Sequence, residues 1–420
     1  MKHFDYLQPK TMDEALASWE PGASWLGGGT NLVDLMKLGV AQPQRVIDLT
    51  RISDLGEITF QQDGSVRIGA MVSNADLARH AGFAQHFPMV AEALLSGASG
   101  QLRNMATVAG NLMQRTRCAY FQEETAACNR RNPGAGCDAR DSDEEVRALL
   151  GASPACVATN PSDFCVPLAA LEAQVEVRGV NGTRQIPFSE FHLLPGDRPE
   201  RETALEEGEL IVALHLSAEA AGFARHARYL KVRDRTSFAF ATTAAAAALR
   251  MEDGIIVEGR LALGAVAARP WRVAEAEALL VGQAPDAALF ARAAEAAMAG
   301  AEAPAHLEWK IDLARRTAAR ALAMAAVRHR HRRGAARIPL WPTERRPRPC
   351  LTRFHRKSVS VPTRVSLPHG GMGLPRSPAL QPLPPTTRPR GCFMRSTPRQ
   401  GSRVAGSANL TLPQHRRTPV

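Results

Sequence analysis

Four cysteines stand close together in the sequence and are the residues best suited to chemistry: Cys118, Cys128, Cys137 and Cys156. Thiolates grouped in this way hold a metal centre or form disulfides. Their spacing, C-x9-C-x8-C-x18-C, lacks the C-x2-C pairs of a zinc ribbon and does not match the ferredoxin ligand run. The spacing alone therefore leaves an iron–sulfur cluster, a zinc site, disulfides or free thiols open.

The rest of the composition favours a metal over disulfides. The chain has 420 residues and seven cysteines, and an odd number with long cysteine-free stretches is unlike a small disulfide scaffold. The first residues lack the apolar core of a secretory signal, and the longest apolar run, 238–249, is too short to span a bilayer. We therefore expect a soluble protein with no membrane partner, made in a reducing compartment where clustered cysteines bind metal.

A glycine-rich turn at residues 27–31, Gly-Gly-Gly-Thr-Asn, is a second candidate site. It follows an expected strand at 24–26 and precedes a segment with helical spacing at 32–37. Glycines let backbone N–H groups approach phosphate oxygens, and the start of the next helix favours negative charge. The turn matches neither the G-x-G-x-x-G fingerprint nor a Walker A loop. By itself it is a phosphate-binding loop or simply a turn.

A third segment, 104–111, combines small residues with polar side chains. Small residues allow a flat ring or a ribityl chain to lie against the backbone, where Thr107 and Asn111 can hydrogen-bond it. Alone, the segment is equally consistent with a glycine-containing loop and a capping asparagine.

The elements that must position these residues form an α+β pattern without an internal repeat. Periodicity predicts strands before the cysteines at 24–26, 45–49 and 65–70, and helices at 71–80 and 89–96. After the cysteines it predicts a strand at 174–177, a hairpin turn at Asn181-Gly182 and a buried strand at 210–214. A new unit begins near Ala221, with a strand at 255–263 and alanine-rich helices at 274–280, 287–299 and 311–326. Residues 238–249 fit either a helix or a strand.

The positive charge of the chain, +11, belongs to its last part. Residues 328–420 carry 20 of the 52 lysines and arginines and one of the 41 acidic residues, which leaves residues 1–327 with a net charge of −8. The globular part therefore gives no reason to expect nucleic-acid binding. We expect 328–420 to be a disordered Arg/Pro-rich tail, which is either a basic arm for nucleic acid or anionic membrane, or out-of-frame sequence.

Four motifs in a fixed order resemble a known family. They are residues 26–32, 103–112, 161–163 and 231–238. Together they are similar to the FAD-binding medium subunit of the molybdenum hydroxylases, which include xanthine dehydrogenase, aldehyde oxidoreductase and carbon monoxide dehydrogenase. The resemblance covers about residues 1–326. It implies an FAD-binding domain of the PCMH/vanillyl-alcohol-oxidase type, in two subdomains, at 1–218, and a smaller α+β CO-dehydrogenase-flavoprotein-like domain at 221–327.

The resemblance also implies roles for single residues. The loop around the FAD pyrophosphate would be Leu26, Gly27, Gly28, Gly29, Thr30, Asn31 and Leu32. Further FAD contacts would come from Thr107, Asn111, Arg117, Asp163, Ile211 and Lys231, with Asp163 on ribityl or ribose hydroxyls and Lys231 near the isoalloxazine. The chain departs from the pattern at Ala109, where relatives commonly carry glycine, and at Asn160, where histidine is frequent.

The cysteines lie in an insertion, 113–160, that many relatives lack. A subset similar to the aldehyde oxidoreductase flavoprotein subunit, and more distantly to hydroxybenzoyl-CoA reductase, carries such an insertion to hold a [4Fe–4S] cluster. The resemblance therefore implies that Cys118, Cys128, Cys137 and Cys156 ligate this cluster, with positive charge supplied by Arg117, Arg130 and Arg131. We expect Cys165, on an apolar helix pattern, to be a buried thiol instead. His192, His215 and His226 lack metal-ligand spacing, and Trp271 and Trp309 are expected to be core or interface aromatics.

The sequence thus predicts the FAD and iron–sulfur subunit of a molybdenum aldehyde oxidoreductase. The family implies a molybdopterin-binding large subunit that oxidises the aldehyde, a small [2Fe–2S] subunit that passes electrons to FAD, and an external electron acceptor. Xanthine, CO and aromatic CoA-ester enzymes remain alternatives, because substrate contacts lie on the partner. A nucleic-acid-binding protein acting through its basic tail is an alternative of another class. The expected location is the cytoplasm, or the periplasm by co-export with a partner carrying a twin-arginine signal.

Overall fold

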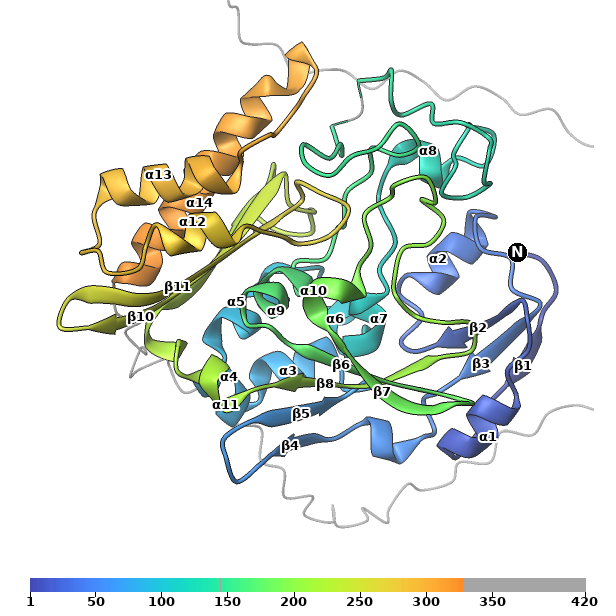
Figure 1. The fold of residues 1–420 in the computed structure, drawn as a ribbon. Coiled ribbons are helices and arrows are strands. Elements are labelled where there is room, and N and C mark those ends of the chain that lie inside the picture. The colour runs from blue at the N-terminus through green and yellow to red at the C-terminus, as the bar shows by residue number, and fades with distance from the viewer. Residues whose placement is uncertain (144, 328–420) are drawn as a thin grey trace, which may run out of the picture. The chain divides into compact units, whose positions relative to one another are not determined.

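The computed structural model of this chain describes residues 1–143 and 145–327, and the predictions for 328–420 lie outside the described residues (Figure 1). The first sheet is small and parallel, with strands β1 (Asp5–Leu7), β3 (Arg45–Asp48) and β2 (Ala23–Leu26) in that order. Helix α1 (Met12–Ala17) begins where the Thr11 side chain accepts the backbone N–H of Glu14. Helix α2 (Leu32–Lys37) follows β2 after the glycine-rich turn. This βαβ arrangement places the turn at the carboxyl end of β2, where parallel sheets bind ligands.

The second sheet is antiparallel and five-stranded, in the order β4-β5-β8-β6-β7. Its strands are β4 (Ile58–Phe60), β5 (Val66–Gly69), β6 (Gln174–Gly179), β7 (Gly182–Pro187) and β8 (Leu210–Leu216). The predicted hairpin is confirmed, since Gly179 pairs with Gly182 and Gly182 has φ +108°. Among the remaining helices of this domain are α3 (Asn74–Arg79), α4 (Ala81–His86), α5 (Pro88–Ser96), α6 (Gly100–Met105), α7 (Val108–Leu112), α9 (Cys165–Ala170), α10 (Phe188–Phe191) and α11 (Ala218–Ala221).

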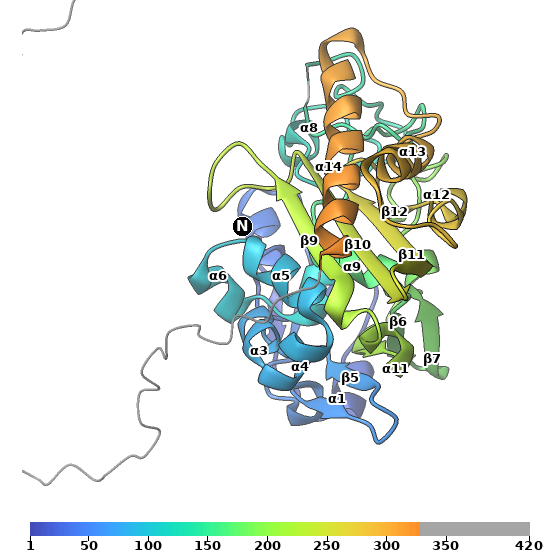
Figure 2. The ribbon, with the colours of Figure 1, turned by 90° about the vertical axis from the view of Figure 1, so that its left-hand side faces the viewer.

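The third sheet is antiparallel, in the order β12-β11-β10-β9. It comprises β9 (Ala227–Val232), β10 (Thr243–Glu252), β11 (Ile255–Gly264) and β12 (Trp271–Arg272). Helices α12 (Ala274–Ala278), α13 (Ala287–Ala297) and α14 (Glu308–Ala326) follow, and α14 runs along β9 and β10 (Figure 2). The α+β prediction and the three alanine-rich helices are therefore confirmed.

Strand β10 settles the ambiguity at residues 238–249. Ala244, Ala246 and Ala248 face a core shared with the first two-thirds of the chain, whereas Ala245 and Ala247 face a second core with α13 and α14. A period of two residues with both faces buried is the pattern of a central strand. Tertiary packing on both faces thus overrides the helical propensity of alanine.

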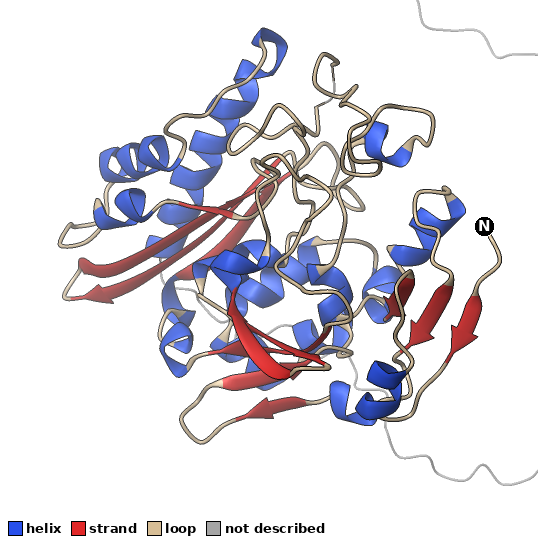
Figure 3. Ribbon diagram, turned by 45° about the vertical axis from the view of Figure 1, so that its right-hand side comes forward, coloured by secondary structure: helices blue, strands red, loops and turns tan. Residues whose placement is uncertain are grey.

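The insertion, 113–160, consists mainly of loops and turns, with one short helix, α8 (Ala119–Gln122) (Figure 3). It has a small core of its own around Cys118, Phe121, Cys128 and Cys156, against which Leu35 of α2 packs. In residues 1–143 and 145–327, no helix is long and apolar enough to cross a membrane.

Candidate functional site

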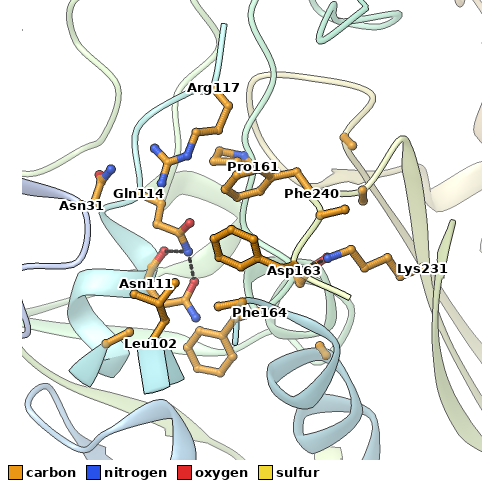
Figure 4. Close-up of a pocket in the computed structure, with 18 of the residues that line it drawn as sticks. Asn31, Leu102, Asn111, Gln114, Arg117, Pro161, Asp163, Phe164, Lys231 and Phe240 are labelled. Atoms are coloured by element: carbon orange, nitrogen blue, oxygen red, sulfur yellow. Dashed lines mark hydrogen bonds and ion pairs between the residues drawn. The ribbon is translucent and has the colours of Figure 1, made fainter. Parts of the chain in front are cut away.

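A cavity of about 630 Å³ lies where the predicted motifs meet (Figure 4). Its walls come from the glycine-rich loop, α6 and α7, residues 159–164 and the loop between β9 and β10. This volume is in the range of sites for large organic ligands. Five basic residues, which suit an anionic ligand, share its lining with four acids: Arg103, Arg117, Lys231, Arg235 and Lys310, with Asp34, Glu145, Asp163 and Asp234.

The glycine-rich loop packs directly against the segment at 105–107. A Cβ atom on Gly28 would lie 1.6 Å from the carbonyl oxygen of Met105, and one on Gly27 would lie 2.7 Å from the hydroxyl of Thr107. Gly29 has φ +72°, in the left-handed region that favours glycine. Only glycine therefore allows this approach, which brings two of the predicted motifs together.

Two asparagines that line the cavity each have a buried side-chain atom without a hydrogen-bond partner among the described residues. Asn31 accepts the backbone N–H of Arg115 at 3.1 Å through Oδ1, while its Nδ2 has no hydrogen-bond partner among the described residues. The Oδ1 atom of Asn74, a residue only 5% exposed, likewise has no partner in the described part of the chain. Buried polar atoms of this kind require partners, and a bound ligand with oxygens and hydroxyls supplies them.

Helix α7 holds the next group of polar side chains. Thr107 caps its first turn by accepting the backbone N–H of Gly110 at 3.2 Å. Asn111 accepts a hydrogen bond from the Ser162 hydroxyl at 2.8 Å and another from the Gln114 amide (Figure 4). The Pro-Ser-Asp triplet at 161–163 is thereby fixed against α7.

A buried ion pair closes the opposite wall. The Lys231 ammonium donates to Oδ2 of Asp163 at 2.7 Å, and the Tyr229 hydroxyl donates to Oδ1 of Asp163 at 2.6 Å. Burial raises the pKa of Asp163, and the Lys231 charge opposes that rise. Burial, followed by the Asp163 charge, raises the pKa of Tyr229 well above 10, so Tyr229 remains a hydrogen-bond donor.

Arg117 extends the positive charge toward the insertion. Its guanidinium lies 4.9 Å from the ring centroid of Phe240, and both residues line the cavity. Burial lowers the pKa of Arg117, and Asp34 opposes that shift. An arginine stays charged under such a shift, so Arg117 offers a permanent cation.

The four clustered cysteines line a second, much smaller pocket. Cys118, Cys128, Cys137 and Cys156 all border it although they come from separate loops, and Cys128 and Cys137 face each other in a β-bridge. Three of the four, Cys118, Cys128 and Cys156, are buried. Burial, followed by the charge of Cys156, raises the pKa of Cys137.

The pocket does not resemble a site for one ion. Within residues 1–143 and 145–327, no group of three or more His, Cys, Asp or Glu side chains lies close enough together to hold a single metal ion. A cubane cluster is larger than an ion and takes four thiolates spread around it. The four cysteines around the pocket offer the four thiolates that such a cluster takes.

Sequence comparisons identify both domains. Residues 2–217 match the model of the FAD binding domain in molybdopterin dehydrogenase, and residues 228–328 match the CO dehydrogenase flavoprotein C-terminal domain. The chain belongs to the FAD-binding subunits of the molybdopterin dehydrogenases. It is a flavoprotein subunit of an oxidoreductase of the aldehyde oxidoreductase and xanthine dehydrogenase type.

Relatives with known roles agree. The chain is 45% identical to the aldehyde oxidoreductase FAD-binding subunit PaoB of Escherichia coli over 330 residues, which are 77% of this chain and 99% of that one. It is 28% identical to the carbon monoxide dehydrogenase medium chain of Hydrogenophaga pseudoflava over 74% of this chain and 91% of that one. Among solved structures, carbon monoxide dehydrogenase from the same organism superposes with a TM-score of 0.60 at 29% identity, covering 77% of this chain and 97% of that one.

The residues of the cavity fit the FAD of this family of subunits. Permanent cations, an unpaired amide donor on Asn31 and a glycine loop without side chains are what a pyrophosphate needs. The unpaired Oδ1 of Asn74 can accept from a ligand hydroxyl.

Six of the thirteen predicted FAD contacts line the cavity. Thr30, Asn31, Asn111, Arg117, Asp163 and Lys231 line the cavity, while Leu26, Leu32 and the three glycines are not among its described lining residues. Thr107 lies behind the glycine loop as a helix cap. Ile211, 4% exposed, packs inside the core of the five-stranded sheet and does not belong to the described lining.

Other lining residues were not predicted, notably Asn74, Gln114, Glu145, Phe240 and Lys310. Gln114 lies two residues after the motif at 103–112, which was the available signal for it, whereas Asn74 follows the helix cap Ser73 and adjoins no predicted motif. Lys310, on α14, donates to the backbone carbonyls of Glu145 and Arg147, and no local pattern indicates this contact.

The cysteine, histidines and tryptophans to which the sequence analysis gave no role in a site have structural contacts. Cys165 is fully buried, and burial raises its pKa to about 12. His192, His215 and His226 each contact a different partner: the Leu112 carbonyl, Glu176 and the Ala325 carbonyl. Trp271 packs on the second core as predicted, and Trp309 on α14 is 46% exposed.

Proposed function

We propose that this chain is the FAD- and [4Fe–4S]-carrying electron-transfer subunit of a molybdenum-dependent aldehyde oxidoreductase. Aldehyde oxidation to carboxylate would occur on a molybdopterin-binding large subunit. Electrons would pass through [2Fe–2S] centres of a small subunit to this chain and on to an external acceptor. The observation that carries the proposal is the meeting of four cysteines from separate loops around one pocket, next to the FAD cavity.

The identity values support the aldehyde enzyme over its relatives. The chain is 45% identical to the E. coli aldehyde oxidoreductase subunit and 27% identical to a putative xanthine dehydrogenase FAD-binding subunit from the same organism. The carbon monoxide dehydrogenase relatives are named as medium chains, which supports large and small subunits as partners. Substrate contacts would lie on the large subunit, so a panel of aldehydes, xanthine and CO tests this part of the proposal.

Two segments of the chain line both the FAD cavity and the cysteine pocket and would link the two sites. In the segment 114–118, Gln114 and Arg117 line the FAD cavity, while Thr116 and Cys118 line the cysteine pocket. In the segment 157–161, Val157 and Ala158 line the cysteine pocket, while Thr159 and Pro161 line the cavity. The insertion therefore places its four cysteines directly beside the cavity proposed for FAD.

The residues of the chain would bind and orient rather than exchange protons. FAD, when bound, supplies transfer of one or two electrons. Arg117 and Asn31 would hold its anionic part, and Asp163, kept in place by Lys231 and Tyr229, would accept hydrogen bonds from its hydroxyls. The cysteines would supply the thiolates of the cluster.

The proposal is tested by producing the full chain together with its partner subunits and purifying the complex without oxygen. About four irons, with matching sulfide, and one FAD per chain are expected for a [4Fe–4S] flavoprotein. Each of the substitutions C118S, C128S, C137S and C156S should lower the iron content and leave FAD bound. C165S is the matched control, because Cys165 lies in the core and not at the pocket. Zinc without iron in the wild type would overturn the cluster, and a complex without FAD would overturn the flavin site.

We further infer a cytoplasmic location, or a periplasmic one reached by co-export with a partner that carries a twin-arginine signal. Fractionation of cells that produce the whole complex distinguishes the two.

A further inference from the structure

Arg130 is the basic residue that lines the cysteine pocket. The sequence predicts that Arg117, Arg130 and Arg131 offset the charge of a cluster. The described residues around the pocket include Arg130 and neither of the other two. Arg117 lines the neighbouring cavity. Arg131 binds backbone carbonyls instead, with Nη1 2.9 Å from the Tyr120 oxygen and 2.8 Å from the Phe121 oxygen. The three arginines therefore differ in role, and only Arg130 brings its charge to the pocket.

The Arg130 guanidinium lies at the cysteine pocket and is anchored by a carboxylate. Arg130 lines the pocket together with Cys156, and its Nη1 atom lies 2.9 Å from Oε2 of Glu202. Its side chain is 6% exposed, and its Nε–H has no acceptor among the described residues. A donor left over beside the thiols is available to a sulfur atom.

Glu202 fixes the position of this arginine from outside the insertion. It belongs to the loop after α10, where its backbone carbonyl accepts the N–H of Leu193. Its carboxylate also accepts from Nε of Arg115 at 2.6 Å, and the Arg115 guanidinium lies 4.5 Å from the ring centroid of Phe121. The carboxylate therefore joins two arginines of the insertion to the body of the FAD-binding domain.

We propose that Arg130 sets the reduction potential of the cluster, and that Glu202 positions Arg130 and partly offsets its charge. This inference rests on the proposed function. A cubane with four thiolates is negatively charged and gains one further negative charge when it takes up an electron. A permanent cation that hydrogen-bonds a ligand sulfur stabilises the more negative state and raises the potential. The effect is strong at this position because a buried charge is screened little by water.

The sign of the effect gives a sharp test. R130Q removes the cation and should shift the potential of the cluster downward, whereas E202Q removes an anion from the same network and should shift it upward. R130K keeps the charge and should stay close to wild type. R140Q is the matched control, because Arg140 lies in the same insertion, is exposed and bonds the carbonyl of Pro154. It should leave the potential unchanged.

The experiment is a redox titration of the purified complex, followed by the EPR signal of the reduced [4Fe–4S] cluster, with iron counted in every variant. Shifts of opposite sign in R130Q and E202Q establish the inference. Unchanged potentials, or shifts in the same direction, overturn it while leaving the cluster itself in place. If R130Q loses its iron, the E202Q variant decides: an upward shift of the cluster potential supports the inference, and an unchanged or lower potential overturns it. Wild-type complex without iron overturns the proposed function instead, so the two failures are distinguishable.

Discussion

The Lys231 ammonium and the Asp163 carboxylate form an ion pair 2.7 Å long at the wall of the FAD cavity, with side chains only 3% and 9% exposed. Removal of one partner from a buried pair leaves an uncompensated charge. D163N should therefore lower the free energy of unfolding by about 3 to 5 kcal/mol. It should also lower the FAD content of the purified complex. Urea unfolding and flavin quantification measure the two effects.

Tyr229 provides the control for this pair, because its hydroxyl also bonds Asp163 but carries no charge. Y229F removes one hydrogen bond to a carboxylate and should cost about 1.5 to 3 kcal/mol. The double variant D163N/K231M removes both charges and should recover part of the stability lost in D163N. A double variant as unstable as D163N would show that the charge left behind is not the cause.

Gly28 lies against the segment at 105–107 too closely for any side chain. G28A would place a Cβ atom 1.6 Å from the Met105 carbonyl oxygen, so the loop or α6 must move. Overpacking of this kind costs about 3 kcal/mol, the upper end of its usual range, and should release FAD because the loop leaves the cavity. G100A is the matched control, since no atom lies within 4 Å of a Cβ at that position. Equal flavin content in G28A and G100A would contradict the role of the close contact.

The glycine loop also illustrates what the sequence could predict. A run of glycines between a strand and a helix is a local signal, and so are the small residues at 104–111, and both motifs meet as the family resemblance implies. The position of Lys310 at the wall of the FAD cavity could not be predicted from a local signal of this kind. Its place depends on how α14 packs on β9 and β10 and on where the insertion loop at 145–147 runs. Both are long-range packing results that leave no local pattern.

The alanines of β10 and the four clustered cysteines also show that local sequence patterns do not reveal long-range packing. Alanine favours helices in isolation, and only the presence of two cores, one on each face, makes residues 243–252 a strand. The cysteine types and spacing predict a centre of some kind, yet spacing did not distinguish a cluster from zinc. The structure adds the pocket that the four loops form and the pairing of Arg130 with the distant Glu202, neither of which leaves a local pattern in the sequence.

Arg117 should increase the affinity for FAD through its positive charge. R117Q removes a half-buried cation that lines the cavity and lies over the ring of Phe240. Loss of a charged hydrogen-bond donor of this kind costs about 1.5 to 3 kcal/mol, or roughly tenfold to a hundredfold in affinity. The FAD retained by the complex during dilution and gel filtration measures this loss. R79Q makes the same change on an exposed arginine of α3 and should retain flavin as the wild type does.

His192 should make the stability of the protein depend on pH. Burial lowers its pKa from 6.5 to about 4, while its Nε2–H donates to the Leu112 carbonyl at 2.9 Å at the end of α7. Because the unfolded chain binds this proton first, the contribution of His192 is complete above pH 6.5, declines between 6.5 and about 4, and is lost below. The loss amounts to about 3 kcal/mol at most.

Unfolding free energies of the wild type, H192Q and H3Q between pH 7 and 4 check this prediction. H192Q keeps a donor for the Leu112 carbonyl but has no proton to gain, so its stability should fall less steeply than that of the wild type. H3Q, at an exposed position, should follow the wild type. Since α7 carries Asn111, protonation of His192 in the folded protein should also release FAD as the pH falls through about 4 in the wild type and not in H192Q. Parallel pH curves for wild type and H192Q would rule out His192 as the source of the acid sensitivity.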